Sequence, residues 1–212
     1  MPDLTLTFDN GPTEATPRVL DLLAEYGITS TFFVLGRQMA DPALRAFAER
    51  AHAEGHWIGN HTYSHAPSLG DYRDFEASIE DVRRAQTLIG DLAHPDRLFR
   101  PYANSGVLDR RVFNRRVVDY LAAERYTVVL WNAVPRDWQT SAWVDIALGQ
   151  IHAQPWSLMV LHDQHGRCLP GLERFLPLAR DAGVRFRQDF PVECLAMQRG
   201  EAQASLEPLI AR

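Results

Sequence analysis

The sequence predicts an α/β fold, an irregular or incomplete (β/α) barrel of about seven parallel strands. First, short apolar runs alternate with amphipathic segments along the whole chain, the pattern of a parallel sheet covered by helices. Second, polar and titratable residues follow five of these runs, where the active sites of such barrels lie. Third, the chain has 212 residues, which is short for a complete barrel of about 250 residues.

Seven short runs rich in apolar and β-branched residues are predicted as strands. The first reads Leu-Thr-Leu-Thr-Phe over residues 4–8, and the fifth reads Tyr-Thr-Val-Val-Leu-Trp over residues 126–131. Because a helical segment separates each run from the next, the strands are expected to lie parallel. In chain order the runs cover residues 4–8, 29–35, 56–59, 97–99, 126–131, 157–161 and 184–186.

Six segments between these runs are predicted as helices because their apolar residues recur at helical spacing. The first places Val19, Leu20 and Leu23 close together and stops at Gly27, and the last is closed by Gly183. The six segments cover residues 16–26, 42–53, 74–90, 109–124, 141–152 and 172–182.

The chain is predicted to form one domain over residues 1–212, because no repeat and no Pro-, Gly- or Ser-rich linker divides it. Residues 189–212 carry no recognisable motif and form a C-terminal extension of unassigned role. This extension is expected to pack as a helix or to fray.

Composition and charge exclude several classes of function. All 22 basic residues are arginine, so Schiff-base lysine chemistry and a P-loop lysine are absent. A net charge of -5 argues against nucleic acid as a partner. No apolar run approaches the ~20 residues of a membrane span, and no signal peptide is visible, so the expected location is the cytoplasm. The two cysteines, Cys168 and Cys194, are expected to be ordinary core residues.

Two histidines and two strand-end groups suggest a catalytic site. His61 and His65 stand four residues apart, a spacing that lets both imidazoles reach one metal ion. The same spacing also fits two solvated loop histidines. Asp9 and the pair His162-Asp163 directly follow predicted strands, where titratable residues are more often functional than structural.

Five short motifs in a fixed order resemble a known family. They are Thr7-Phe8-Asp9-Asn10-Gly11-Pro12, His61-x-x-x-His65, Phe99-Arg100-Pro101-Tyr102, Arg136-Asp137-Trp138 and Val160-Leu161-His162-Asp163. Their order and spacing resemble those of the polysaccharide deacetylases, the NodB-homology or carbohydrate esterase 4 group. The resemblance spans nearly the whole chain, and it implies an irregular (β/α) barrel and hydrolytic removal of acetyl groups from N-acetylated sugars.

The resemblance implies a metal centre with an adjacent general base. Asp9 matches the general base, and Arg100 matches the residue that orients it. His61 and His65 match two ligands of a divalent metal, expected to be zinc. The third ligand in the family is usually aspartate, whereas this chain has Asn10. An amide oxygen can still coordinate a cation, but it is neutral, so the affinity for the metal should be lower.

The resemblance also implies the other half of the reaction. Tyr102 matches the position whose backbone N–H helps to stabilise the oxyanion, although the third motif is one residue shorter here than in the family. His162 matches the general acid that protonates the leaving amine, and Asp137 matches the acid that tunes it. Trp138 matches a wall of the sugar groove.

Three functions are consistent with these residues. The first is a metal-dependent deacetylase acting on a carbohydrate or another small N-acylated substrate. The second is a metal-independent hydrolase of another C–N bond, which Asn10 motivates. The third is a catalytically degenerate carbohydrate-binding protein, motivated by Asn10 and the shortened third motif. Chelator-sensitive acetate release would distinguish the first from the other two.

Overall fold

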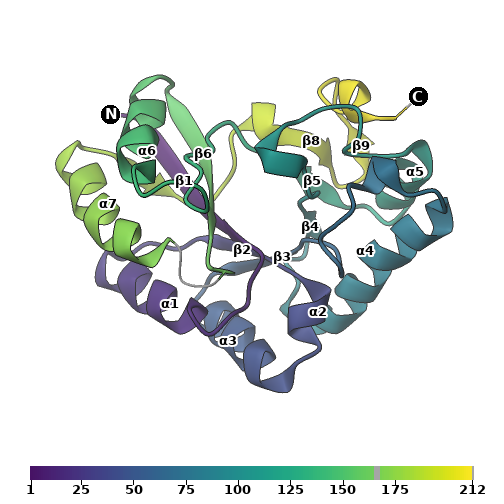
Figure 1. Cartoon of the computed structure of the whole chain (residues 1–212), viewed down its shortest axis with the longest axis horizontal. Helices are drawn as coiled ribbons and strands as arrows, with labels where there is room; N and C mark the ends of the chain where they lie inside the picture. Colours follow the sequence, from purple (N-terminus) through teal and green to yellow (C-terminus); the bar gives the residue numbers. More distant parts are fainter. Residues whose placement is uncertain (165–167, 212) are drawn as a thin grey trace.

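The fold is a mixed α/β barrel that is open on one side. The structure, a computed structural model, describes residues 1–164 and 168–211. Its sheet curls into a half-barrel in which the order of strands is β6-β1-β2-β3-β4-β5-β8-β9, and β7 also pairs with β1 (Figure 1). The predicted fold class, an incomplete (β/α) barrel, is confirmed.

The first seven strands are parallel, as the alternating pattern predicts. β1 lies inside the sheet: β6 runs along its whole length, while β7 and β2 pair with its beginning and its end. These strands are β1 (Asp3–Asp9), β2 (Thr31–Val34), β3 (Trp57–Asn60), β4 (Leu98–Phe99), β5 (Thr127–Val129), β6 (Trp156–His162) and β7 (Arg185–Arg187).

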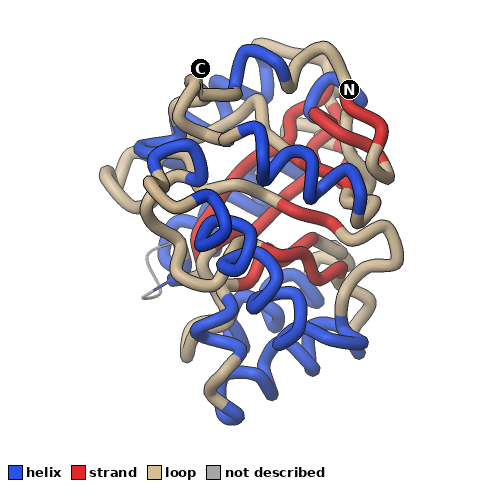
Figure 2. The backbone as a smooth tube through the Cα atoms, turned by 90° about the vertical axis from the view of Figure 1, so that its right-hand side faces the viewer, coloured by secondary structure: helices blue, strands red, loops and turns tan. Residues whose placement is uncertain are grey.

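The helices lie on the outside of the curled sheet, and most of them form an arc from α7 through α1, α3 and α4 to α5 (Figures 1 and 2). They are α1 (Thr16–Glu25), α2 (Gly36–Met39), α3 (Pro42–Ala53), α4 (Phe75–Ile89), α5 (Arg115–Ala123), α6 (Trp143–His152) and α7 (Leu169–Asp181). None of the helices in the described part of the chain has the length and apolarity to cross a membrane.

The two faces of β1 separate the core from the site. Alternate residues of a strand point to opposite faces. Leu4, Leu6 and Phe8 accordingly pack into the cluster that joins the sheet to the outer helices. Thr7 and Asp9 lie on the other face and are also buried. The interior of the half-barrel therefore receives polar groups at the strand ends.

The C-terminal segment differs from its prediction. The expected helix or frayed end is wrong: β8 (Leu195–Gln198) pairs antiparallel with β5, and β9 (Glu201–Ala202) pairs with β8. Ala196 and Met197 are buried in the same cluster as the apolar face of α5. The segment therefore extends the sheet beyond β5 and covers that part of the core.

The predicted helix over 109–124 also begins too early. α5 starts at Arg115, because the side chain of Asn114 accepts a hydrogen bond from the N–H of Val117 and caps the helix. Phe113, just before the cap, instead forms an isolated bridge with Ile210. The short helix α2 was not predicted at all.

Candidate active site

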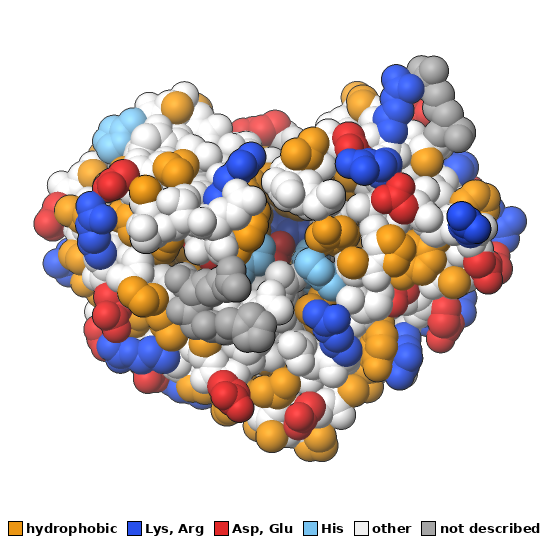
Figure 3. Space-filling model, viewed as in Figure 1, with side chains coloured by type: hydrophobic (Ala, Val, Ile, Leu, Met, Phe, Trp, Pro, Cys, Tyr) orange, Lys and Arg blue, Asp and Glu red, His pale blue; other side chains and the backbone are white. Residues whose placement is uncertain are grey.

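The predicted site residues converge on one pocket. A cavity of about 410 Å³ lies at the carboxyl ends of the parallel strands, and it opens on the face seen in Figure 3. Seven of the nine predicted residues line it, namely Asp9, Asn10, His61, His65, Tyr102, Trp138 and His162. The other two, Arg100 and Asp137, are buried behind them and bind residues of the pocket wall.

A buried ion pair forms the floor of the site. Nη1 of Arg100 donates to Oδ1 of Asp9 at 3.0 Å and to Oγ1 of Thr7 at 2.6 Å. Its other nitrogens donate to the carbonyl oxygens of Val129 and Leu130. Burial by itself raises the pKa of Asp9, but the charge and hydrogen bond of Arg100, together with His61 and His162, outweigh it and the pKa is lowered. Asp9 is therefore a carboxylate although it is almost completely buried.

His61 has a defined tautomer. Its Nδ1 lies 2.7 Å from the carbonyl oxygen of Arg100, which can only accept, so Nδ1 carries the proton. Nε2 then has a free lone pair and lies 3.8 Å from Oδ2 of Asp9. Burial lowers the pKa of His61, so the ring is neutral. Two acceptors that face each other in this way leave space for a cation or for a donor such as water.

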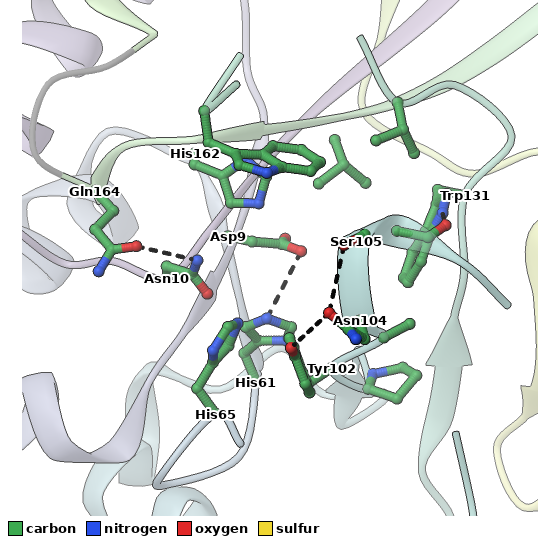
Figure 4. A pocket seen from close by; sticks show the side chains of 16 residues that line it. Asp9, Asn10, His61, His65, Tyr102, Asn104, Ser105, Trp131, His162 and Gln164 are labelled. Atoms are coloured by element: carbon green, nitrogen blue, oxygen red, sulfur yellow. Dashed lines mark hydrogen bonds and ion pairs between the residues drawn. The ribbon is translucent and has the colours of Figure 1, made fainter. Parts of the chain in front are cut away.

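His65 and Asn10 complete a donor set around this space. Burial, together with the nearby His61, lowers the pKa of His65 to about 3, so this imidazole is also neutral, the form that binds metals. The side-chain nitrogen of Asn10 donates to Gln164 at 3.4 Å. Its Oδ1 is buried without a hydrogen-bond partner among the described residues. Figure 4 shows this oxygen turned toward the two imidazoles.

These groups fit a divalent cation. Within residues 1–164 and 168–211, no three His, Cys, Asp or Glu side chains are arranged as metal ligands, and the unpartnered amide oxygen of Asn10 offers a further donor beside the two imidazoles. Two neutral imidazoles and an otherwise unsatisfied buried oxygen are ligands that zinc accepts, although oxygen donors are usually carboxylates.

His162 is held by a carboxylate on the other side of the pocket. Its Nδ1 donates to Oδ1 of Asp137 at 2.8 Å, and its backbone N–H donates to Oδ2 of the same group at 2.8 Å. Burial lowers the pKa of His162, but the hydrogen bond and charge of Asp137, with smaller contributions from Asp9 and Asp163, outweigh it and the pKa is raised. The ring packs edge-on against Trp138, with centroids 4.7 Å apart. His162 can therefore present a protonated Nε2 to the pocket.

Tyr102 lies beside the histidine pair. Its ring is tilted against that of His65, with centroids 4.3 Å apart. Its hydroxyl donates to Oδ1 of Asn104 at 3.4 Å. No described residue accepts a hydrogen bond from its backbone N–H. This N–H is therefore available as a donor.

Sequence reasoning missed the supporting roles of three residues. The hydroxyl of Thr7 accepts a hydrogen bond from Arg100 and donates one to the carbonyl of Met159. The period-two alternation of β1 could have placed Thr7 on the same face as Asp9. Asp163 is fully buried, its pKa is raised by burial to about 7, and Oγ1 of Thr16 donates to it. The side-chain oxygen of Gln164 accepts a hydrogen bond from the side-chain nitrogen of Asn10. The partners of Asp163 and Gln164 lie far away in the sequence, so no spacing indicates them.

Comparisons with known proteins agree with this geometry. Residues 2–129 match the polysaccharide deacetylase family. The chitooligosaccharide deacetylase of Sinorhizobium fredii is 31% identical over 206 residues, which are 88% of this chain and 89% of that protein. A peptidoglycan-N-acetylglucosamine deacetylase of Bacillus cereus is 31% identical over 194 residues, covering 86% of this chain and 84% of the relative.

Solved structures are similar over the same span. A deacetylase solved with substrate superposes with a TM-score of 0.70 at 30% identity, covering 88% of each chain. The peptidoglycan deacetylase PdaC of Bacillus subtilis has a TM-score of 0.69 at 25% identity, covering 87% of this chain and 86% of its own.

The ion pair on the floor gives a prediction for stability. Arg100→Met leaves the carboxylate of Asp9 buried without its cation, and we expect a loss of about 3–5 kcal/mol in the free energy of unfolding. The double variant Asp9→Asn with Arg100→Met should lose less than the sum of the two single changes. Urea-induced unfolding measures both. Strictly additive losses would show that the two residues do not depend on each other.

Proposed function

The chain belongs to the polysaccharide deacetylase family, and we propose that it removes acetyl groups from N-acetylated sugars by hydrolysis of the amide C–N bond. The relatives named above are deacetylases of chitooligosaccharides and of peptidoglycan N-acetylglucosamine. An amide of this kind needs a base for the attacking water, a donor for the oxyanion and an acid for the amine.

One observation carries this proposal. Asp9 and His162 end neighbouring strands at paired positions, so both side chains reach the same pocket (Figure 4). Their surroundings push the two pKa values apart, since that of Asp9 is lowered and that of His162 is raised. A carboxylate base next to an imidazolium acid is the pair that amide hydrolysis uses.

The reaction follows from these two groups. Asp9 accepts a proton from a water molecule, whose oxygen attacks the carbonyl carbon of the acetyl group. The oxyanion that forms accepts a hydrogen bond from the backbone N–H of Tyr102. Nε2 of His162 then gives its proton to the amine nitrogen as the C–N bond breaks. Acetic acid, which ionises to acetate, and the free amino sugar leave; Asp9 then gives up its proton and His162 takes one up through solvent, while Asp137 holds the His162 ring in place throughout.

A divalent metal, zinc in our proposal, is the cofactor. His61, His65 and Asn10 would hold it. When bound, such an ion polarises a carbonyl oxygen and lowers the pKa of water. The unsatisfied Oδ1 of Asn10 supports this assignment. Because the amide is neutral, the site has one negative charge fewer than a site with aspartate, and we expect weaker binding of the metal.

Sugar recognition is assigned to the pocket walls. Trp138 lines the pocket beside His162 and offers an aromatic surface of the kind that sugar rings stack on. Asn104 and Ser105 line it on the opposite side, near Tyr102, and offer hydrogen bonds to hydroxyl groups (Figure 4). A mixed wall of this kind suits a carbohydrate better than an apolar ligand.

The proposed activity is tested by acetate release from short chitooligosaccharides, with added zinc and with a chelator. We expect zinc-dependent release in the wild type. Asp9→Asn and His162→Gln should each lower kcat by about 10²–10⁴. Release that ignores the chelator would favour the metal-independent hydrolase, and tight glycan binding without turnover would favour the binding protein.

Asn10→Asp tests the metal assignment. Restoring a negative charge among the ligands should tighten zinc binding by about tenfold or more, because charge-assisted interactions are roughly twice as strong as neutral ones. Competition with a chromophoric chelator measures the affinity. Asn104→Asp, at another position of the pocket wall, is the control and should change zinc affinity much less. Equal effects of the two variants would contradict coordination by residue 10.

The Asp137–His162 pair predicts a pH dependence. The lowered pKa of Asp9 keeps the base charged into the acidic range, and the raised pKa of His162 keeps the acid protonated at higher pH. Asp137→Asn removes the charge that contributes most to raising the pKa of His162, while burial, which lowers it, remains. The alkaline limb of the kcat/KM profile should therefore move to lower pH. The acidic limb should stay in place, and an unmoved alkaline limb would argue against His162 as the acid.

A further inference from the structure

The loop that presents the two histidines has a demanding backbone. It connects β3 to the region before α4, and two of its residues adopt left-handed conformations, Thr62 with φ 67° and His65 with φ 76°. Residues with side chains rarely adopt this region, and they keep it only where the surroundings hold them. The direction of the His65 imidazole therefore depends on whatever holds this loop.

Every backbone N–H from Thr62 to His65 has a partner. Thr62 donates to Oδ1 of Asn60, and His65 donates to Oγ1 of Thr62. These two bonds stay within the loop and its strand. The N–H groups of Tyr63 and Ser64 instead donate to a residue outside the loop, and the acceptor in both cases is the same residue of α4.

That residue is Asp81. Its backbone carbonyl accepts from the N–H of Tyr63 at 3.0 Å. Its carboxylate accepts from the N–H of Ser64 at 3.2 Å, through Oδ1, and from the hydroxyl of Ser64 at 3.0 Å, through Oδ2. Hydrogen bonds to a carboxylate are roughly twice as strong as those between neutral groups. The residue next to His65 is thus fixed to α4 at two points by one side chain.

The opposite side of the loop is held by backbone. The N–H groups of Gly36 and Arg37, at the start of α2, donate to the carbonyls of Thr62 and Tyr63. These contacts fix the beginning of the loop. The backbone of Ser64, by contrast, is bonded by side chains. Its N–H donates to the carboxylate of Asp81, and its carbonyl accepts from the guanidinium of Arg37 at 3.3 Å.

We propose that Asp81 is a positioning residue of the site: its carboxylate holds Ser64, and thereby keeps His65 in the left-handed conformation that directs its imidazole beside His61. The inference rests on the proposed metal site, because His65 is assigned there as a ligand. Groups that orient metal ligands typically change affinity by 10- to 100-fold when they are removed.

The experiment compares three variants of the full chain. Asp81→Ala removes both bonds to Ser64, and Asp81→Asn keeps one acceptor oxygen with the same shape. Glu80→Ala is the matched control, since Glu80 lies on the same helix, is more than half exposed and pairs only with Arg83 among the described residues. Zinc affinity is measured by chelator competition, and hydrogen exchange of residues 61–66 is followed by mass spectrometry.

We expect Asp81→Ala to weaken zinc binding by about 10- to 100-fold and to speed exchange of the loop. Asp81→Asn should lie between Asp81→Ala and the wild type in both zinc affinity and loop exchange, and Glu80→Ala should match the wild type. Wild-type zinc affinity in Asp81→Ala would overturn the proposal even if its Tm fell. A loss of zinc affinity in Asp81→Asn as large as that in Asp81→Ala would also overturn it.

Failure of the metal site and misfolding of a variant can each be told apart from failure of the Asp81 proposal. If the wild type takes up no zinc, the proposed metal site fails, and the exchange of residues 61–66 alone decides whether Asp81 orders the loop. Unchanged exchange in Asp81→Ala would then overturn the proposal. If Asp81→Ala does not fold, Asp81→Asn decides it, since that variant should still bind zinc more weakly than Glu80→Ala.

Discussion

The rest of the site depends on one buried ion pair, that between Arg100 and Asp9. A carboxylate buried at the floor of the pocket would ordinarily tend to take up a proton and lose its value as a base. The guanidinium opposes this: its Nη1 binds both Asp9 and Thr7, and its other nitrogens bind the carbonyls of Val129 and Leu130. The same cation therefore keeps the base charged and ties β1 to β5 across the half-barrel.

Around this pair, different elements of the fold position the other groups of the site. The register of β1 against β6 places Asp9 beside His162, which no short segment could achieve. The loop after β5 brings Asp137 to His162 and so raises the pKa of the imidazole. The outer helix α4 supports the histidine loop from behind. Acid, base and histidine pair thus come from separate elements that only the complete sheet aligns.

Much of this was predictable from sequence, for identifiable reasons. Strand alternation and helical spacing depend on nearby residues, so the parallel strands and most helices followed from them. Polar residues at strand ends converge because parallel strands end at one edge, which predicted the grouping of Asp9, His61 and His162. The prediction failed where distant partners decide: the C-terminal segment became a strand because the free edge of β5 lay open to it. Asp81 and Gln164 gave no signal, since their partners are set by packing alone.

The position of β1 inside the sheet has a consequence for how the protein is made. Of the described strands, β1 is synthesised first, whereas its neighbours β6 and β7 are the last two of the parallel strands. For most of synthesis, one edge of β1 has no partner of its own chain, and an unpaired edge is where wrong pairings begin. Asp9 likewise has no His162 beside it until β6 has been synthesised. A nascent chain therefore cannot assemble the acid–base pair until His162, which follows Asp9 by 153 residues, has been synthesised.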